Sequence, residues 1–103
     1  MFVDLGATKL LAAQKAERKI AVEIKSFVNA SPVTDLEVAL GQYILYQNIM
    51  EETEPERQLY LAIRKATYRE IFSEPIGSLV IKKNSLHLLI FDPQKEAIAQ
   101  WID

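Results

Sequence analysis

The chain has no cysteine, one histidine, three glycines and four prolines among its 103 residues. The absence of cysteine excludes disulfides, thiolate metal sites and a cysteine nucleophile, and fits a reducing compartment. No run of apolar residues approaches the roughly 20 that are needed to span a bilayer, and the N-terminus does not resemble a signal peptide. We therefore expect a cytoplasmic protein that does not associate with membranes.

Half of the residues are apolar and a quarter are charged, which is typical of one small folded domain over residues 1–103. The formal net charge of -2 excludes a strongly basic nucleic-acid module that is held by overall charge alone. An enzyme that acts on DNA stays compatible with this charge, because an acidic cation site can coexist with a basic rim.

The pattern of apolar residues predicts a mixed α/β domain with a central sheet. Strands are predicted over 2–5, 8–13, 19–27, 59–63, 86–91 and 96–102. A helix is predicted from 33 or 34 to 50, with either Ser31 or Thr34 as its N-cap. A short helix is predicted over 67–72, and 76–82 is compatible with another.

Glu23 and Lys25 stand two residues apart in the strand with the clearest alternation. Side chains alternate between the two faces of a strand, so both charges should share one face while Ile20, Val22 and Ile24 occupy the other. Charges that project from a covered strand are costly unless they are paired or bound to a cation. A plain surface ion pair is the simpler alternative.

Asp4 provides a second carboxylate, 23 − 4 = 19 residues before Glu23, which leaves room for one intervening hairpin. If their strands are near neighbours, the two carboxylates can converge on one cation. Two carboxylates, a backbone carbonyl and waters suit Mg²⁺, with Mn²⁺ as an alternative. Lys25 would then orient or deprotonate a water, or offset charge on a phosphate. For Asp4 the simpler alternative is a turn or strand-end residue.

The segments VDLG at 3–6 and VEIK at 22–25 resemble the PD…(D/E)xK signature of restriction-endonuclease-like nucleases, without its proline. Longer runs are more specific: FVDLGATKLLAAQKAERKIAVEIKSF, SPVTDLEVALGQYILY, EPERQLYLAI and FDPQKEAIAQWI are similar to the XisH family. Members of this family are known as excision controlling factors for the fdxN DNA element. The resemblance covers 2–103 and implies a restriction-endonuclease-like fold, in which helices flank a mixed central sheet.

The resemblance implies that Asp4 and Glu23 are metal ligands, that the backbone carbonyl of Ile24 is a further ligand, and that Lys25 is the catalytic lysine. It also implies an N-terminal helix before the first strand, which packs on the sheet and can supply another acidic residue. This chain lacks that helix, so we expect a partner chain to cover the exposed face.

Some related nucleases also use a Gln and a Tyr on the helix that follows this strand. Gln42 and Tyr46 match that spacing, one helical turn apart, which makes Gln42 a further catalytic candidate. Tyr46 fits equally well as a core aromatic of an amphipathic helix. Gly41 is expected to let the helix pack closely on the sheet.

Three other features favour structural explanations. His87, between two leucines of an apolar strand, is expected to be a structural histidine with satisfied hydrogen bonds, and Trp101 a core or interface aromatic. The acidic run from 51 to 54 is expected to be a solvated loop that faces away from DNA.

Two functions follow as hypotheses. The first is a Mg²⁺-dependent DNA endonuclease that takes part in programmed excision of a DNA element. The second is a non-catalytic regulatory or interaction subunit that keeps the nuclease fold. The second predicts a homo-oligomer such as a dimer, or a complex with a second excision factor.

Overall fold

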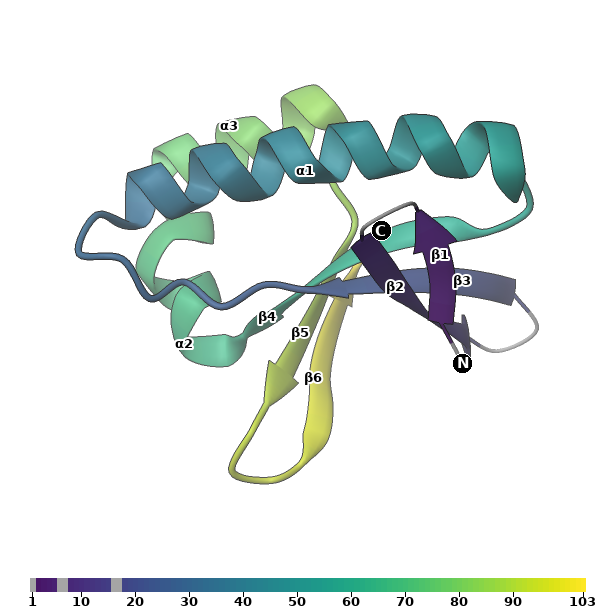
Figure 1. Ribbon diagram of the computed structural model, residues 1–103. Helices are drawn as coiled ribbons and strands as arrows, with labels where there is room; N and C mark the ends of the chain where they lie inside the picture. Colours follow the sequence, from purple (N-terminus) through teal and green to yellow (C-terminus); the bar gives the residue numbers. More distant parts are fainter. Residues whose placement is uncertain (1, 6–7, 16–17) are drawn as a thin grey trace.

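The computed structural model describes residues 2–5, 8–15 and 18–103, and the side chains of Lys15 and of 18–103. Its elements in chain order are β1 (Phe2–Leu5), β2 (Thr8–Lys15), β3 (Arg18–Ile24), α1 (Pro32–Thr53), β4 (Gln58–Arg64), α2 (Lys65–Thr67), η1 (Tyr68–Phe72), α3 (Pro75–Asn84), β5 (Leu88–Asp92) and β6 (Ala97–Ile102). Figure 1 shows α1 and α3 over one side of the sheet, with the β5–β6 hairpin extending away from them. In the described ranges, no helix combines the length and apolar character that a membrane span needs.

The described strands form one six-stranded sheet in sequence order, which confirms the mixed α/β fold. β3, β4 and β5 are parallel, and the other neighbours are antiparallel. Parallel neighbours need crossover connections, which α1 and then α2, η1 and α3 provide. The ends of β3, β4 and β5 at Ile24, Arg64 and Asp92 therefore lie at one edge, the carboxyl edge. Their starts at Arg18, Gln58 and Leu88 lie at the amino edge.

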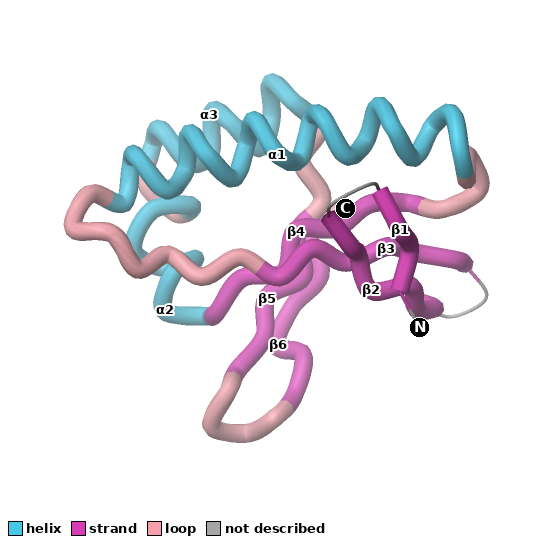
Figure 2. The backbone as a smooth tube through the Cα atoms, viewed as in Figure 1, coloured by secondary structure: helices cyan, strands magenta, loops and turns pink. Residues whose placement is uncertain are grey.

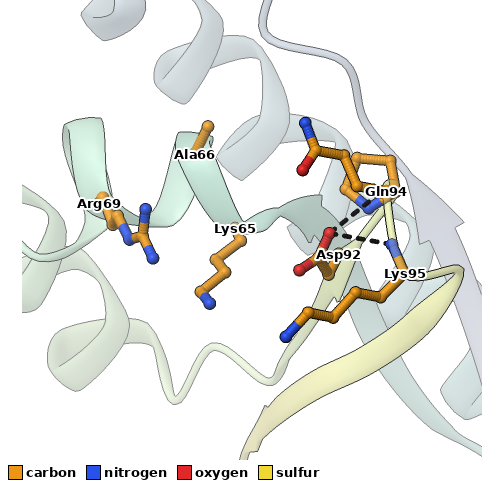
Figure 3. A pocket seen from close by; sticks show the side chains of 7 residues that line it. Lys65, Ala66, Arg69, Asp92, Gln94 and Lys95 are labelled. Atoms are coloured by element: carbon orange, nitrogen blue, oxygen red, sulfur yellow. Dashed lines mark hydrogen bonds between the residues drawn. The ribbon is translucent and has the colours of Figure 1, made fainter.

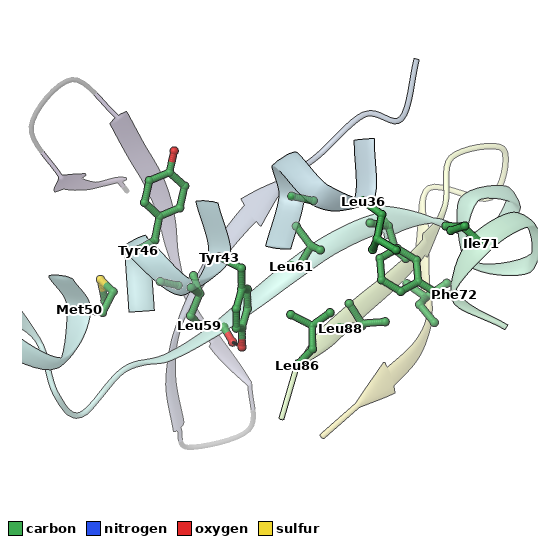
Figure 4. Packing of buried hydrophobic residues seen from close by; sticks show 14 residues of the cluster. Leu36, Tyr43, Tyr46, Met50, Leu59, Leu61, Ile71, Phe72, Leu86 and Leu88 are labelled. Carbon is green, nitrogen blue, oxygen red and sulfur yellow. Dashed lines mark hydrogen bonds between the residues drawn. The ribbon is translucent and has the colours of Figure 1, made fainter. Parts of the chain in front are cut away.

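One face of the sheet, here the helical face, is covered by α1, η1 and α3. Figure 4 shows buried side chains of α1 and η1 packed against those of the strands. The buried residues of this cluster are Ala21, Leu36, Ala39, Tyr43, Tyr46, Met50, Leu59, Leu61, Ile63, Ile71, Phe72, Leu86, Leu88 and Ile90. The buried hydroxyl of Tyr43 donates to the carbonyl of Leu59 at 3.0 Å and accepts the amide of His87 at 3.3 Å. These bonds attach the middle of α1 to β4 and to the start of β5.

The opposite face carries a second cluster, and none of its described residues comes from a helix. Its members are Ile20, Val22, Tyr60, Ala62 and Leu89, with Phe91 and Trp101 packed against them. The described helices therefore all pack on the helical face, and strand side chains alone form this second cluster. Trp101 is half-buried and packs edge-on against Tyr60, with ring centroids 5.0 Å apart, which is compatible with both of its expected roles, a core or an interface aromatic.

Two proposals for the cap of α1 are resolved by one hydrogen bond. Ser31 is the N-cap, since its Oγ accepts the amide of Thr34 at 3.3 Å and Pro32 occupies the first turn. The expected role of Gly41 is wrong: it is exposed, and a Cβ there would meet nothing within 4 Å.

Gly77 instead makes the close approach, in the segment that the sequence left ambiguous. That segment is a helix, α3, and a Cβ at Gly77 would lie 2.2 Å from the carbonyl oxygen of Ile71. The preceding turns begin as α-helix in α2 and continue as π-helix in η1. Gly77 therefore seats α3 directly on the backbone of η1.

Candidate metal and phosphodiester site

Glu23 lies near the carboxyl edge on β3 and shares the helical face with Ala21. Its side chain is 8 % exposed, and its buried Oε1 has no hydrogen-bond partner among the described residues. Burial raises the pKa of this carboxyl to about 7, while the positive charge of Lys25 acts in the opposite direction. An ionised carboxylate in this position lacks the compensation that burial normally requires, so it suits a bound cation.

Lys25 follows directly after β3, yet its backbone still belongs to the parallel ladder. Its amide donates to the carbonyl of Ala62 at 3.1 Å, and its side chain is half-buried. Alternation along the strand therefore places Lys25 on the same face as Glu23, as the sequence predicts.

The backbone carbonyl of Ile24 points away from β4. Because carbonyls alternate in direction along a strand and the Lys25 amide bonds to β4, the carbonyl of Ile24 is directed toward the β2 side. The described β2–β3 pairing ends at Val22, opposite Leu11. The carbonyl of Ile24 therefore lies beyond the described pairing of β2 with β3.

Asp4 lies in β1, opposite Lys9 of β2. Its side chain is outside the described part of the structure. β2 stands between β1 and β3, so the backbones of Asp4 and Glu23 belong to next-but-one strands, about 10 Å apart across the sheet. The role of Asp4 as the second carboxylate stays a prediction.

The remaining two candidate site residues, Gln42 and Tyr46, lie on α1. Gln42 is half-buried on α1, and Tyr46 is 7 % exposed and belongs to the cluster on the helical face. Tyr46 therefore is part of the core, as one of its two interpretations predicted. The role of Gln42 stays a prediction.

The residues around Glu23 determine whether a metal ion fits there. Among the described residues, no group of three or more His, Cys, Asp or Glu side chains is placed to hold a metal ion. Glu23 nevertheless fits as one ligand, because its Oε1 is a buried hard oxygen that no described residue hydrogen-bonds. Mg²⁺ keeps several waters when it binds, so one or two carboxylates and a carbonyl are a sufficient protein contribution.

The loop after Lys25 is braced by a carboxylate that sequence reasoning missed. Asp35, in the first turn of α1 and 3 % exposed, accepts the amide of Asn29 at 2.9 Å and its Nδ2 group at 2.6 Å. Phe27 packs edge-on against Phe72, with centroids 5.8 Å apart. These contacts hold the loop, which runs from β3 past α2 to α1 in Figure 2, beside the candidate site. The signal available in the sequence was an acidic residue just after the Ser31 cap.

His87 lies just before β5 and packs edge-on against Tyr60 with centroids 5.5 Å apart, on the opposite face from Leu86 and Leu88. That orientation agrees with the sequence. Its Nδ1, however, is buried without a hydrogen-bond partner among the described residues, so the expected satisfied histidine is not what the structure shows.

A family model described as XisH protein matches residues 1–99. The chain belongs to the XisH family. It is similar to the crystal structure of an XisH family protein from Nostoc punctiforme PCC 73102, with 37 % identity, a TM-score of 0.87, and coverage of 100 % of this chain and 83 % of that one. It is also similar to a fdxN element excision controlling factor protein from Anabaena variabilis, with 36 % identity, a TM-score of 0.86, and coverage of 100 % and 82 %. No curated protein matches this XisH chain.

Proposed function

We propose that this XisH-family chain acts in the control of excision of a DNA element, and that it does so by Mg²⁺-dependent hydrolysis of phosphodiester bonds. The similarity to an excision controlling factor protein supports the first part. The observation that carries the second is the buried Oε1 of Glu23, which has no hydrogen-bond partner in the described part of the chain, with Lys25 on the same face of the strand.

Each residue has a distinct role in this proposal. Glu23 and the carbonyl of Ile24 would hold the metal, with Asp4 of the neighbouring β1–β2 hairpin as the expected second carboxylate. When bound, Mg²⁺ acts as a Lewis acid on a phosphoryl oxygen and lowers the pKa of a coordinated water. Lys25 would donate to that water or to a phosphate oxygen, and Gln42 on α1 would be a further catalytic residue.

The pKa of Glu23 gives the proposal a pH signature. Metal binding requires the carboxylate, and burial raises the pKa of Glu23 to about 7. Below that pH a proton competes with the cation. Metal affinity should therefore rise about tenfold per pH unit below pH 7 and level off above it.

Nicking of supercoiled plasmid DNA tests the proposed function. We expect the wild type to nick with Mg²⁺ or Mn²⁺, and Lys25→Ala and Glu23→Gln to be slower by about a hundredfold or more, as is typical when one stabilising group is lost. Lys82→Ala is the matched control, because it removes the same side chain from an exposed site on α3. Equal background nicking by the wild type and Lys25→Ala would exclude catalysis.

Calorimetric titration with Mn²⁺ separates the metal site from turnover. Glu23→Gln keeps the size of the side chain but removes its charge, so we expect binding in the wild type and none in the variant. Binding that is unchanged in Glu23→Gln would show that the cation sits elsewhere.

A second candidate is a non-catalytic regulatory subunit that works through protein partners. It is favoured by large apolar side chains that stay exposed on the helices, namely Val38, Ile44 and Leu45 on α1 and Ile76 and Leu79 on α3. This candidate predicts a homo-oligomer, or a complex with a second excision factor, and no metal-dependent nicking. Mass measurement in solution, alone and with that factor, tests it, and a monomer that is indifferent to the factor would contradict it.

A further inference from the structure

A pocket of about 350 Å³ opens between the first helical turns after β4 and the β5–β6 turn. Lys65 and Arg69 line it from the helical side, and Gln94 and Lys95 from the turn. In Figure 3 the charged ends of Lys65 and Lys95 are directed toward the same open space, with the guanidinium of Arg69 beyond Lys65. Here we call Lys65, Arg69 and Lys95 the basic patch.

The charges of the basic patch are not used inside the fold. None of the three cations forms a salt bridge with a described residue. Asp92 also lines the pocket, but its Oδ1 accepts the amides of Gln94 at 3.0 Å and Lys95 at 3.3 Å. That carboxylate therefore shapes the turn, and three cations against one carboxylate leave the pocket positive.

The basic patch lies at the same edge of the sheet as Glu23. Lys65 follows the last residue of β4, and Asp92 is the last residue of β5, so the patch belongs to the carboxyl edge. Leu61 is the β4 partner of Glu23, and Arg64 stands three residues further on, about 10 Å along the strand. In open α/β sheets, ligands typically bind at the carboxyl ends of the parallel strands.

Acidic residues gather at the other edge. Glu51 and Glu52 lie in the last turn of α1, which runs to Thr53, so the acidic run expected as a loop is largely helical. Glu54 and Glu56 lie in the segment that joins α1 to β4, at the amino edge. The net charge of -2 therefore conceals a positive region at the carboxyl edge. A polyanion that approaches the protein meets attraction on the side of Glu23 and repulsion near the α1–β4 connection.

We infer that the basic patch binds the phosphodiester backbone of duplex DNA and holds it across the carboxyl edge. Such contacts position a duplex without reading its sequence. The choice of duplex DNA as the ligand rests on the proposed function, whereas the binding itself needs neither Glu23 nor a metal ion.

Fluorescence anisotropy with a labelled DNA duplex, in EDTA and over a series of salt concentrations, tests the inference. Lys65→Gln/Lys95→Gln is compared with Lys82→Gln/Lys83→Gln, which removes the same two charges from exposed positions on α3. We expect Kd to rise about tenfold in the patch variant, and the slope of log K against log salt to become shallower by about 2. The control should bind like the wild type, and Arg69→Gln should lower the slope by about 1.

The inference fails if the two double variants weaken binding equally, or if the wild type does not bind duplex DNA in EDTA. Thermal melts of both variants exclude loss of fold as the cause. Patch-dependent binding without metal-dependent nicking would support the basic patch and overturn the nuclease. Metal-dependent nicking, together with unchanged DNA binding by the patch variant, would support the nuclease and overturn the role of the basic patch.

Discussion

The two edges of the sheet differ in whether their charged side chains have partners within the fold. At the amino edge, Arg57 donates to Glu54 at 2.9 Å and to the carbonyl of Ile20 at 3.0 Å, and Lys15 pairs with Asp103. At the carboxyl edge, Glu23 has a buried oxygen without a described partner, and the basic patch forms no described salt bridge.

This difference separates charges that stabilise the fold from charges that the fold leaves available. A buried carboxylate without a partner is costly when ionised, so Glu23 is suited to a bound cation. The buried Nδ1 of His87, at the amino edge, also has no described partner, so the contrast concerns the charged groups and not every polar atom. The paired charges at the amino edge therefore stabilise the fold. The charges at the carboxyl edge are available to a cation and a phosphate backbone.

Gly77→Ala should have the largest effect on stability, because it disrupts the packing of α3 on η1, next to the carboxyl edge. The new methyl group would lie 2.2 Å from the carbonyl oxygen of Ile71 and 2.3 Å from the Cα of Phe72, both of them backbone atoms. We expect the free energy of unfolding in urea to fall by about 3 kcal/mol or more, since α3 must move away from η1.

Gly41→Ala is the control for that change. It is also helical but meets nothing within 4 Å, so we expect it to stabilise the protein by about 0.5–1 kcal/mol. A similar loss of stability in both variants would mean that the close contact between α3 and η1 is not the reason why alanine destabilises position 77.

Glu23→Gln should have the next largest effect on stability, and its effect should depend on pH. The pKa of Glu23 is raised from 4.5 to about 7 in the folded protein, so the native state holds this proton more tightly than the unfolded state. Without metal, the wild type therefore loses stability as pH rises from about 4.5 to about 7. The stability of Glu23→Gln relative to wild type should increase by about 2–3 kcal/mol between pH 5 and pH 8.

Urea unfolding of both proteins in EDTA at the two pH values measures this difference. Adding Mn²⁺ at pH 8 should stabilise the wild type and leave Glu23→Gln unchanged. A stability difference that does not depend on pH would contradict the raised pKa of Glu23.

Arg57→Ala should have the smallest of the three effects, and the opposite sign to Glu23→Gln at alkaline pH. The side chain of Arg57 is 9 % exposed, and its loss leaves Glu54 and the carbonyl of Ile20 without their donor. We expect a cost of about 2 kcal/mol in urea unfolding. Lys65→Ala, at the carboxyl edge, should change stability by less than about 0.5 kcal/mol. Equal costs at both positions would remove the distinction between the edges.

Much of the fold was accessible from the sequence, because local patterns determine elements. Alternation along β3 and the residue after it predicted that Glu23 and Lys25 share a face, in agreement with the β3–β4 register. The amphipathic pattern of the helix also allowed Tyr46 to be a core aromatic, which it is. The errors lie where tertiary contacts decide. Gly41 was expected to be the close-packed glycine, whereas Gly77 is the one against a backbone.

By itself, the sequence determined the order of the elements, the placement of Glu23 and Lys25 two residues apart along one strand, and the family of the chain, since period, spacing and long matching runs are local properties. The tertiary structure decided which charges are satisfied. Whether Glu54 meets Arg57, or whether Lys65 comes beside Lys95, depends on how distant segments are brought to one edge of the sheet. That proximity comes from crossover connections and strand register, so no local pattern in the chain reports it.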